Sequence, residues 1–180
     1  FSSRVAGAQV NLAPRNDSFE IDNRVVRNAI DQNTKIIFIS SPNNPTGNTT
    51  TKEQVVKLLE TGLIVVVDEA YYEFCGETAA GLVENNENLV VLRTMSKWAG
   101  LAGLRIGYGI MNPIVVKHIM DIKQPYNVST AAEVALIASI NDSDWLLDKI
   151  NMIISERDRM FSLFDRISGV KPWPSKGNFI

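Results

Sequence analysis

The chain has 180 residues, of which 45% are hydrophobic and 21% are charged, as is typical of a folded globular protein. Its formal net charge of −2 gives no electrostatic reason to expect nucleic acid or a membrane surface as a partner. No apolar run approaches the roughly 20 residues of a membrane-spanning helix, and the single cysteine, Cys75, excludes a disulfide within these residues.

The first part of the chain alternates between helix-like and strand-like patterns. Residues 21–30 and 52–60 carry apolar side chains at helical spacing, and the threonines before Lys52 and the glycine at position 62 fit the two ends of the second helix. Four strands are expected, at residues 35–40, 63–68, 89–93 and 105–110. Nearly continuous Val/Ile runs indicate strands covered on both faces, as in parallel sheets. We therefore expect an α/β fold with a mostly parallel sheet flanked by helices.

From Pro113 onward the pattern is helical. Helices are expected at residues 114–122, 131–140 and 144–167, the last with a broad apolar stripe. A long helix after an α/β sheet suggests a passage into a second domain. The expected organisation is a major domain at 1–145, an interdomain helix at 146–168 and the start of a small C-terminal α/β domain at 169–180.

The two ends of the sequence suggest a piece of a longer protein. The chain begins at Phe1 rather than at a methionine, and it stops at Ile180 in what reads as the opening of a strand. A short apolar strand with nothing after it would leave an unfinished sheet edge.

Polar segments follow the strands, at the place where ligand sites form in α/β sheets. Residues 41–47 follow the first strand, 68–71 end the second, 94–97 follow the third, and Arg105 lies eight positions beyond Lys97. Each segment alone has a plainer explanation, such as a turn, a cap, a solvated loop or a surface cation. The set, in this order, favours convergence on one ligand.

These segments resemble the cofactor motifs of fold type I aminotransferases, which depend on pyridoxal phosphate (PLP). The motifs are Asn44-Pro45-Thr46-Gly47, Asp68-Glu69-Ala70-Tyr71, Thr94-Met95-Ser96-Lys97 and Gly103-Leu104-Arg105-Ile106-Gly107. Within that group, the chain most resembles histidinol-phosphate aminotransferases, particularly their plant and algal members. The resemblance runs from about Asn11 to the last residue and implies the PLP-binding major domain of that fold.

The resemblance also implies a role for each matching residue. Lys97 forms the Schiff base (internal aldimine) with PLP and shifts the substrate's proton as a general base. Asp68 pairs with the pyridinium nitrogen and keeps the ring protonated. Asn44 and Tyr71 donate hydrogen bonds to the phenolic oxygen. The expected phosphate ligands are Thr94, Ser96 and Arg105.

Two further residues are candidates for the substrate side of the pocket. Tyr126 and Asn127 lie in a segment, residues 123–129, that also resembles the family. A tyrosine packed in a loop after a helix is an equally good interpretation of Tyr126.

The chain departs from the family's pattern in two ways. Trp98 stands where many members have a small residue, and we expect its ring to point away into packing. Residues 1–7 look shortened, so the glycine-containing phosphate loop and the aromatic ring that stacks on PLP are expected before Phe1. A substrate-binding arginine is expected after Ile180.

The implied reaction is transamination between L-histidinol phosphate, the amino donor, and 2-oxoglutarate, the acceptor, in histidine biosynthesis. The resemblance further implies a homodimer, in the cytosol or in a plastid stroma. One alternative is another PLP-dependent aminotransferase or a phospho-amino-acid decarboxylase. The other is a non-catalytic chain of the same fold, against which the intact site motifs argue. With one histidine, His118, neither a metal site nor a Ser-His-Asp triad is expected.

Overall fold

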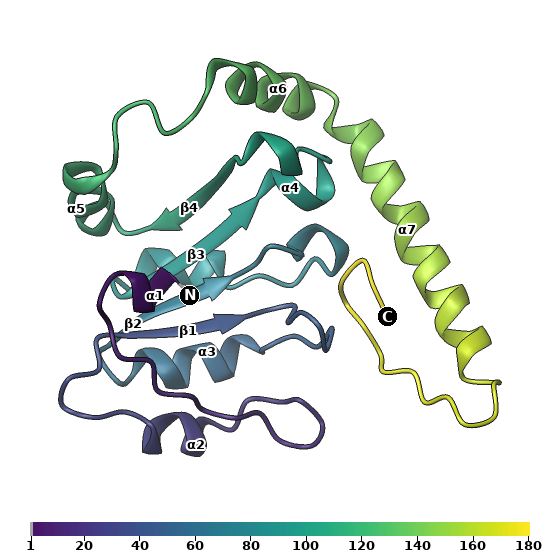
Figure 1. The fold of residues 1–180 in the computed structure, drawn as a ribbon, viewed down its shortest axis with the longest axis horizontal. Helices are drawn as coiled ribbons and strands as arrows, with labels where there is room; N and C mark the ends of the chain where they lie inside the picture. Colours follow the sequence, from purple (N-terminus) through teal and green to yellow (C-terminus); the bar gives the residue numbers. More distant parts are fainter. Residues whose placement is uncertain (1) are drawn as a thin grey trace.

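The computed structural model describes residues 2–180, so Phe1 and the expectations that concern it lie outside the described residues. A four-stranded sheet in the order β1-β2-β3-β4 forms the centre of the fold (Figure 1). The strands are β1 (Ile36–Ser40), β2 (Ile64–Asp68), β3 (Leu89–Thr94) and β4 (Gly107–Met111). The first three are parallel, and β4 is antiparallel to β3. The predicted mostly parallel α/β sheet is confirmed.

The helices follow the sequence pattern closely. The α-helices are α1 (Ser2–Val5), α2 (Asn23–Asn28), α3 (Lys52–Leu59), α4 (Met95–Trp98), α5 (Pro113–Ile122), α6 (Thr130–Asn141) and α7 (Ser143–Phe164). Short 3-10 helices occur at η1 (Tyr72–Phe74), η2 (Ala80–Asn85) and η3 (Ala102–Leu104). The five predicted helices are all present, with ends shifted by a few residues, whereas the one-turn helices α1 and α4 were not predicted. No helix among the described residues is long and apolar enough to cross a membrane.

Helix α3 illustrates how local sequence fixes an element. Thr51 and Gln54 form a capping box, in which each side chain accepts a hydrogen bond from the other residue's backbone N–H, at 3.2 and 2.9 Å. Beyond the helix, Gly62 adopts a left-handed conformation with φ of 73°. The buried side chains of α3 pack with α2 against the sheet, and this cluster forms the main core.

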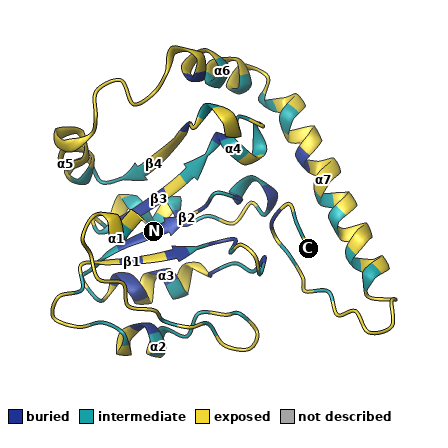
Figure 2. Cartoon of the chain, in the orientation of Figure 1, coloured by how far each residue is buried: buried dark blue, intermediate teal, exposed yellow. Residues whose placement is uncertain are grey.

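The strands of the sheet differ in how far they are buried (Figure 2). Three consecutive residues of β2, 65–67, are buried, as are residues 89–91 of β3, so these central strands are covered on both faces as predicted. In β1, however, Ile36 and Phe38 are 44% and 63% exposed. The prediction of two covered faces is therefore wrong for β1, because among the described residues only the side of α3 covers this edge strand.

The C-terminal segment differs from the prediction. Residues 165–180 form no strand and return as a loop between α7 and the carboxyl ends of β1 and β2 (Figure 1). A strand needs a neighbour for its backbone hydrogen bonds, and no described strand lies beside this segment. The loop is held instead by a bond from Arg157 Nη1 to the Gly177 carbonyl, at 2.9 Å, and one from Lys176 N to the Gly47 carbonyl, at 2.7 Å. The three-part domain division remains a prediction.

The capping box of α3 gives a direct stability test. We expect Thr51→Ala to lower the free energy of unfolding by about 1 kcal/mol, since the N–H of Gln54 loses its acceptor. Urea denaturation followed by circular dichroism measures the change. Thr49→Ala is the matched control, because the Thr49 hydroxyl makes no hydrogen bond to another described residue. Equal effects of the two variants would contradict the capping role.

Candidate active site

Three loops meet at the carboxyl ends of the parallel strands. Asn44, after β1, donates a hydrogen bond from Nδ2 to the hydroxyl oxygen of Tyr71, after β2, at 2.7 Å. Lys97, in α4 after β3, places its Nζ 5.5 Å from the centroid of the Tyr71 ring. The structure therefore brings together Asn44, Tyr71 and Lys97, three residues that the sequence predicted to share a site.

The ring of Tyr71 is held in an apolar pocket. It is buried, and the ring of Phe179 meets it edge-on with a centroid separation of 5.2 Å. Phe74 and Ile150 complete this cluster. Because the hydroxyl accepts from Asn44, its own proton remains free to donate to a ligand. The contact with Phe179 was not predicted, since nothing in the sequence shows that the C-terminal loop folds back onto Tyr71.

Asp68 ends β2 with an exposed carboxylate. Its Oδ1 accepts a hydrogen bond from the N–H of Ala70 at 3.0 Å, and its backbone carbonyl accepts from the N–H of Ser41 at 2.9 Å. These bonds fix the residue at the junction of β1 and β2. An ionised carboxylate has several acceptor positions, so Asp68 keeps the capacity to accept from a ligand.

Thr94 and Ser96 form the start of α4. The Thr94 hydroxyl caps the helix by accepting from the N–H of Ser96 at 3.1 Å, and it lies 2.9 Å from the Ser96 hydroxyl. Met95 is buried and anchors the turn in the core. The helix thus presents Lys97 as an exposed side chain next to two hydroxyl groups.

Arg105 lies between η3 and β4 in a left-handed conformation, with φ of 54°. Its side chain is exposed and donates from Nη1 to the carbonyl of Ala102 at 2.9 Å. The next residue, Ile106, accepts from the N–H of Met95 at 3.2 Å, which ties the Arg105 segment to the start of α4. Gly107 permits this approach, because a Cβ there would lie 2.6 Å from the carbonyl oxygen of Arg93.

The structure does not bring Tyr126 and Asn127 to this site. Tyr126 is 96% exposed in the connection between α5 and α6, and Asn127 bonds to Lys123 Nζ at 3.1 Å. Among the described residues, no hydrogen bond or ring contact joins either one to Lys97 or its neighbours. Their role in substrate binding remains a prediction.

Trp98 packs inward, as the sequence analysis favoured. Its ring lies against the cluster around Tyr71 and also against the cluster around Met95 and Ile106. Its indole Nε1 is buried and has no hydrogen-bond partner among the described residues. The bulky residue after Lys97 therefore joins two parts of the core and does not fill the site.

A buried ion pair between Glu69 and Arg93 lies directly behind these residues, with side chains 2% and 11% exposed. Neither residue was among the predicted site residues. A signal was present, because each of the two residues adjoins a predicted site residue. Glu69 directly follows β2 and Arg93 lies near the end of β3, and these two strands pair in parallel.

Partial burial beside this ion pair affects Glu73, in η1. Burial raises the pKa of Glu73 from 4.5 to about 7, although Arg93 opposes the shift. The folded state thus favours the protonated carboxyl. The resulting stability is fully present below pH 4.5 and is lost as the pH rises through about 7.

Glu73→Gln tests this shift. After allowance for solvent screening, we expect the variant to unfold with a free energy about 1 kcal/mol higher than wild type at pH 8.5, and with a smaller difference at pH 5. Urea denaturation at the two pH values measures both differences. Glu87→Gln, in an exposed loop, is the control. A gain that does not depend on pH would contradict the assignment.

Comparison with known proteins shows the family to which the chain belongs. The aminotransferase class I and II family matches residues 2–180. A histidinol-phosphate aminotransferase of Dehalococcoides mccartyi (strain CBDB1) is 44% identical over 174 residues, which cover 97% of this chain and 48% of the relative. The chloroplastic histidinol-phosphate aminotransferase 1 of Arabidopsis thaliana is 42% identical over 182 residues, which cover 100% of this chain and 44% of the relative.

A solved structure has the same fold. The histidinol-phosphate aminotransferase of Sinorhizobium meliloti, crystallised in complex with pyridoxal-5'-phosphate, superposes with a TM-score of 0.86 at 27% identity, over 98% of this chain and 50% of that one. The chain spans about half the length of the curated relatives it matches. It belongs to the aminotransferase class I and II family.

Proposed function

We propose that the protein is a PLP-dependent aminotransferase that transfers an amino group between L-histidinol phosphate and 2-oxoglutarate. The convergence of Asn44, Tyr71 and Lys97 at the strand ends carries this proposal. The names of relatives that are more than 40% identical over nearly the whole chain support the substrate and a place in histidine biosynthesis.

The described groups fit PLP by their chemistry. The cofactor offers an aldehyde, a ring nitrogen, a phenolic oxygen and a phosphate, and when bound it supplies an electron sink for the substrate's α-carbon. The chain offers an exposed amine at Lys97, an exposed carboxylate at Asp68 and a free hydroxyl proton at Tyr71. Each of these matches one cofactor group. Asp68 would hold a proton on the ring nitrogen, because an anionic neighbour favours the protonated form.

Lys97 would hold the cofactor covalently and then move a proton between substrate and cofactor. Among the described residues its amine has no hydrogen bond or ion pair, and it lies over the face of Tyr71. An amine in such a setting is free to react with an aldehyde. Its position on a capped helix turn limits the directions in which it can reach.

The phosphate would lie between the start of α4 and Arg105. Thr94 and Ser96 supply hydroxyl groups there, and the guanidinium of Arg105 has N–H groups beyond the one that binds Ala102. Arginine suits phosphate because its planar fork meets two oxygens and stays protonated.

Further features are part of the proposal. The relatives' length leaves room for the expected phosphate loop, stacking aromatic and substrate-binding arginine outside this chain. We propose a homodimer, and a plastid or cytosolic location; the Arabidopsis relative is chloroplastic by name. The rivals are another PLP aminotransferase, a phospho-amino-acid decarboxylase and a non-catalytic chain.

Covalent trapping tests the cofactor assignment. We expect borohydride reduction of the PLP-saturated protein, followed by peptide mass spectrometry, to place a pyridoxyl group on Lys97. Lys97→Ala should lose the adduct, whereas Lys123→Ala, at an exposed lysine bonded to Asn127, should keep it. A Lys97 peptide free of pyridoxyl in the reduced wild-type protein would overturn the assignment.

Product analysis tests the reaction and the substrate. We expect the kcat/KM of amino transfer to 2-oxoglutarate to be at least about tenfold higher with histidinol phosphate than with aspartate or aromatic amino acids. A tenfold preference requires a difference of only about 1.4 kcal/mol in activation free energy between the two substrates. Release of carbon dioxide from a phosphorylated amino acid would favour the decarboxylase. Covalent PLP without turnover of any substrate would favour the non-catalytic rival.

A further inference from the structure

We propose that Glu69 and Arg93 are positioning residues for the cofactor site. They form a buried network on the face of the sheet that α3 covers, and this network fixes the chain segments that contain Asp68, Tyr71 and Lys97. This inference rests on the proposed function, because it concerns the geometry of the groups that would hold PLP.

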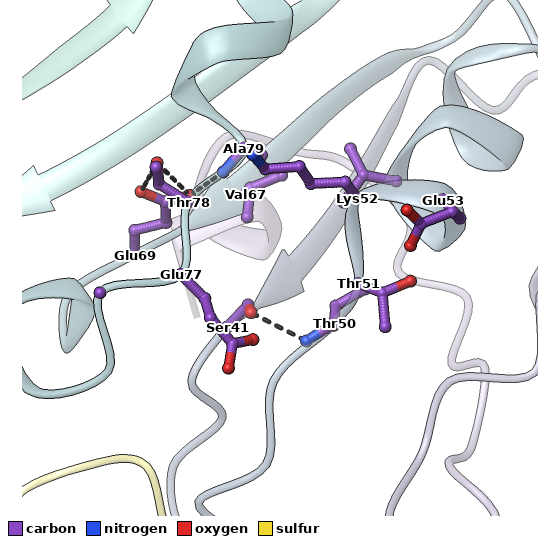
Figure 3. Close-up of a pocket in the computed structure, with 12 residues that line it drawn as sticks. Ser41, Thr50, Thr51, Lys52, Glu53, Val67, Glu69, Glu77, Thr78 and Ala79 are labelled. Carbon is purple, nitrogen blue, oxygen red and sulfur yellow. Dashed lines mark hydrogen bonds between the residues drawn. The ribbon is translucent and has the colours of Figure 1, made fainter.

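The network begins with the ion pair. Arg93 donates from Nε and Nη2 to Glu69 Oε2, at 3.1 and 3.0 Å. The Thr78 hydroxyl lies 2.8 Å from the same oxygen, and the N–H of Ala79 donates to Oε1 at 2.6 Å (Figure 3). The Arg93 guanidinium also stacks on the ring of Tyr72, 3.5 Å from its centroid.

The hydrogen bonds of the network use both carboxylate oxygens of Glu69, Nε and Nη2 of Arg93 and the hydroxyl of Thr78. The Thr78 hydroxyl donates its one proton to Glu69, and its oxygen accepts from Arg93 Nη2 at 2.8 Å and from the N–H of Ala80 at 2.9 Å. Both carboxylate oxygens of Glu69 are in use. A satisfied buried network of this kind has one low-energy arrangement, so it holds its members in fixed relative positions.

Three members of the network are each next in sequence to a candidate cofactor residue. Glu69 follows Asp68, and Tyr72 follows Tyr71. Arg93 precedes Thr94, whose hydroxyl caps the helix that carries Lys97. Three separate segments of the site are therefore each held at an adjacent residue.

Strand alternation places the network and the site on opposite faces. Val67 and Val91 belong to the core that α3 covers, and Glu69 and Arg93 continue the same alternation. Asp68 and Thr94 fall on the other face. The ion pair thus lies on the face covered by α3 and does not occupy the face on which Asp68 and Thr94 lie.

The network lies where the pairing between β2 and β3 ends. The N–H of Glu69 donates to the carbonyl of Leu92 at 2.8 Å, one position beyond the last β2–β3 register pair. Past this bond the chain turns into η1 on one side and into α4 on the other. The Glu69–Arg93 contact extends the tie between the two strands to this point.

A plainer role is possible for any buried ion pair, which can simply be part of a stable core. Removing one partner leaves an unpaired charge and destabilises, whereas replacing both often leaves stability unchanged. The decisive variant therefore changes both partners. Glu69→Gln combined with Arg93→Met removes both charges and keeps an acceptor for the N–H of Ala79 and the hydroxyl of Thr78.

The test compares this double variant with wild type and with Glu60→Gln. The control breaks the exposed Arg27–Glu60 ion pair, which joins α2 and α3 away from the site. Circular dichroism and Tm establish folding. Two readouts follow that do not depend on turnover: the Kd for PLP and the pH midpoint of the absorbance change of bound PLP.

We expect the folded double variant to bind PLP at least about tenfold more weakly, because small displacements of positioned groups have large effects. We also expect its absorbance midpoint to move by about half a pH unit or more. Both values should stay at the wild-type level in Glu60→Gln. A folded double variant that matches the control in both readouts overturns the inference.

A milder variant covers the case in which the double variant fails to fold. Thr78→Val removes the bridging hydroxyl with little change of shape. The Kd for PLP and the pH midpoint of this variant are then compared with those of Glu60→Gln, and values that match the control overturn the inference. Wild-type protein that binds no PLP overturns the proposed function and this inference together. Wild-type protein that binds PLP, with variants that match the control, overturns the inference alone.

Discussion

The parallel pairing of β1, β2 and β3 is the constraint on which the rest of the structure depends. Because the three strands run in one direction, their carboxyl ends reach the same edge of the sheet. The segments that follow the strands carry Asn44, Tyr71 and Lys97, and these residues meet as a direct result of strand direction. The antiparallel β4 then brings the segment after Arg105 back beside α4.

Because side chains alternate along a strand, the buried ion pair and the exposed site residues lie on opposite sides of the sheet. On the side of α3, the strands carry apolar residues along most of their length and the Glu69–Arg93 ion pair at their carboxyl ends. On the other side, Asp68 and Lys97 stay exposed. A charged pair is tolerated in the buried region because hydrogen bonds satisfy both carboxylate oxygens of Glu69 and the Nε and Nη2 groups of Arg93. The exposed side keeps unpaired groups, as a ligand site requires.

Local patterns predicted much of this arrangement. Val/Ile runs and helical spacing are set within short windows, so the strands, the helices and the cap at Thr51 were predictable. Contacts between distant segments were not. The edge-on contact of Phe179 with Tyr71 and the exposure of Phe38 depend on tertiary packing, which no short window encodes. The strand expected near Ile180 needed a neighbour that the described chain lacks.

The segments after β1, β2 and β3 would together form one PLP site around Lys97. A crystal structure of the protein saturated with PLP tests this arrangement. We predict continuous density between Lys97 Nζ and the cofactor, Asp68 within hydrogen-bonding distance of the ring nitrogen, and the phosphate between Ser96 and Arg105. Cofactor density joined to another lysine, or a ring nitrogen far from Asp68, would contradict it.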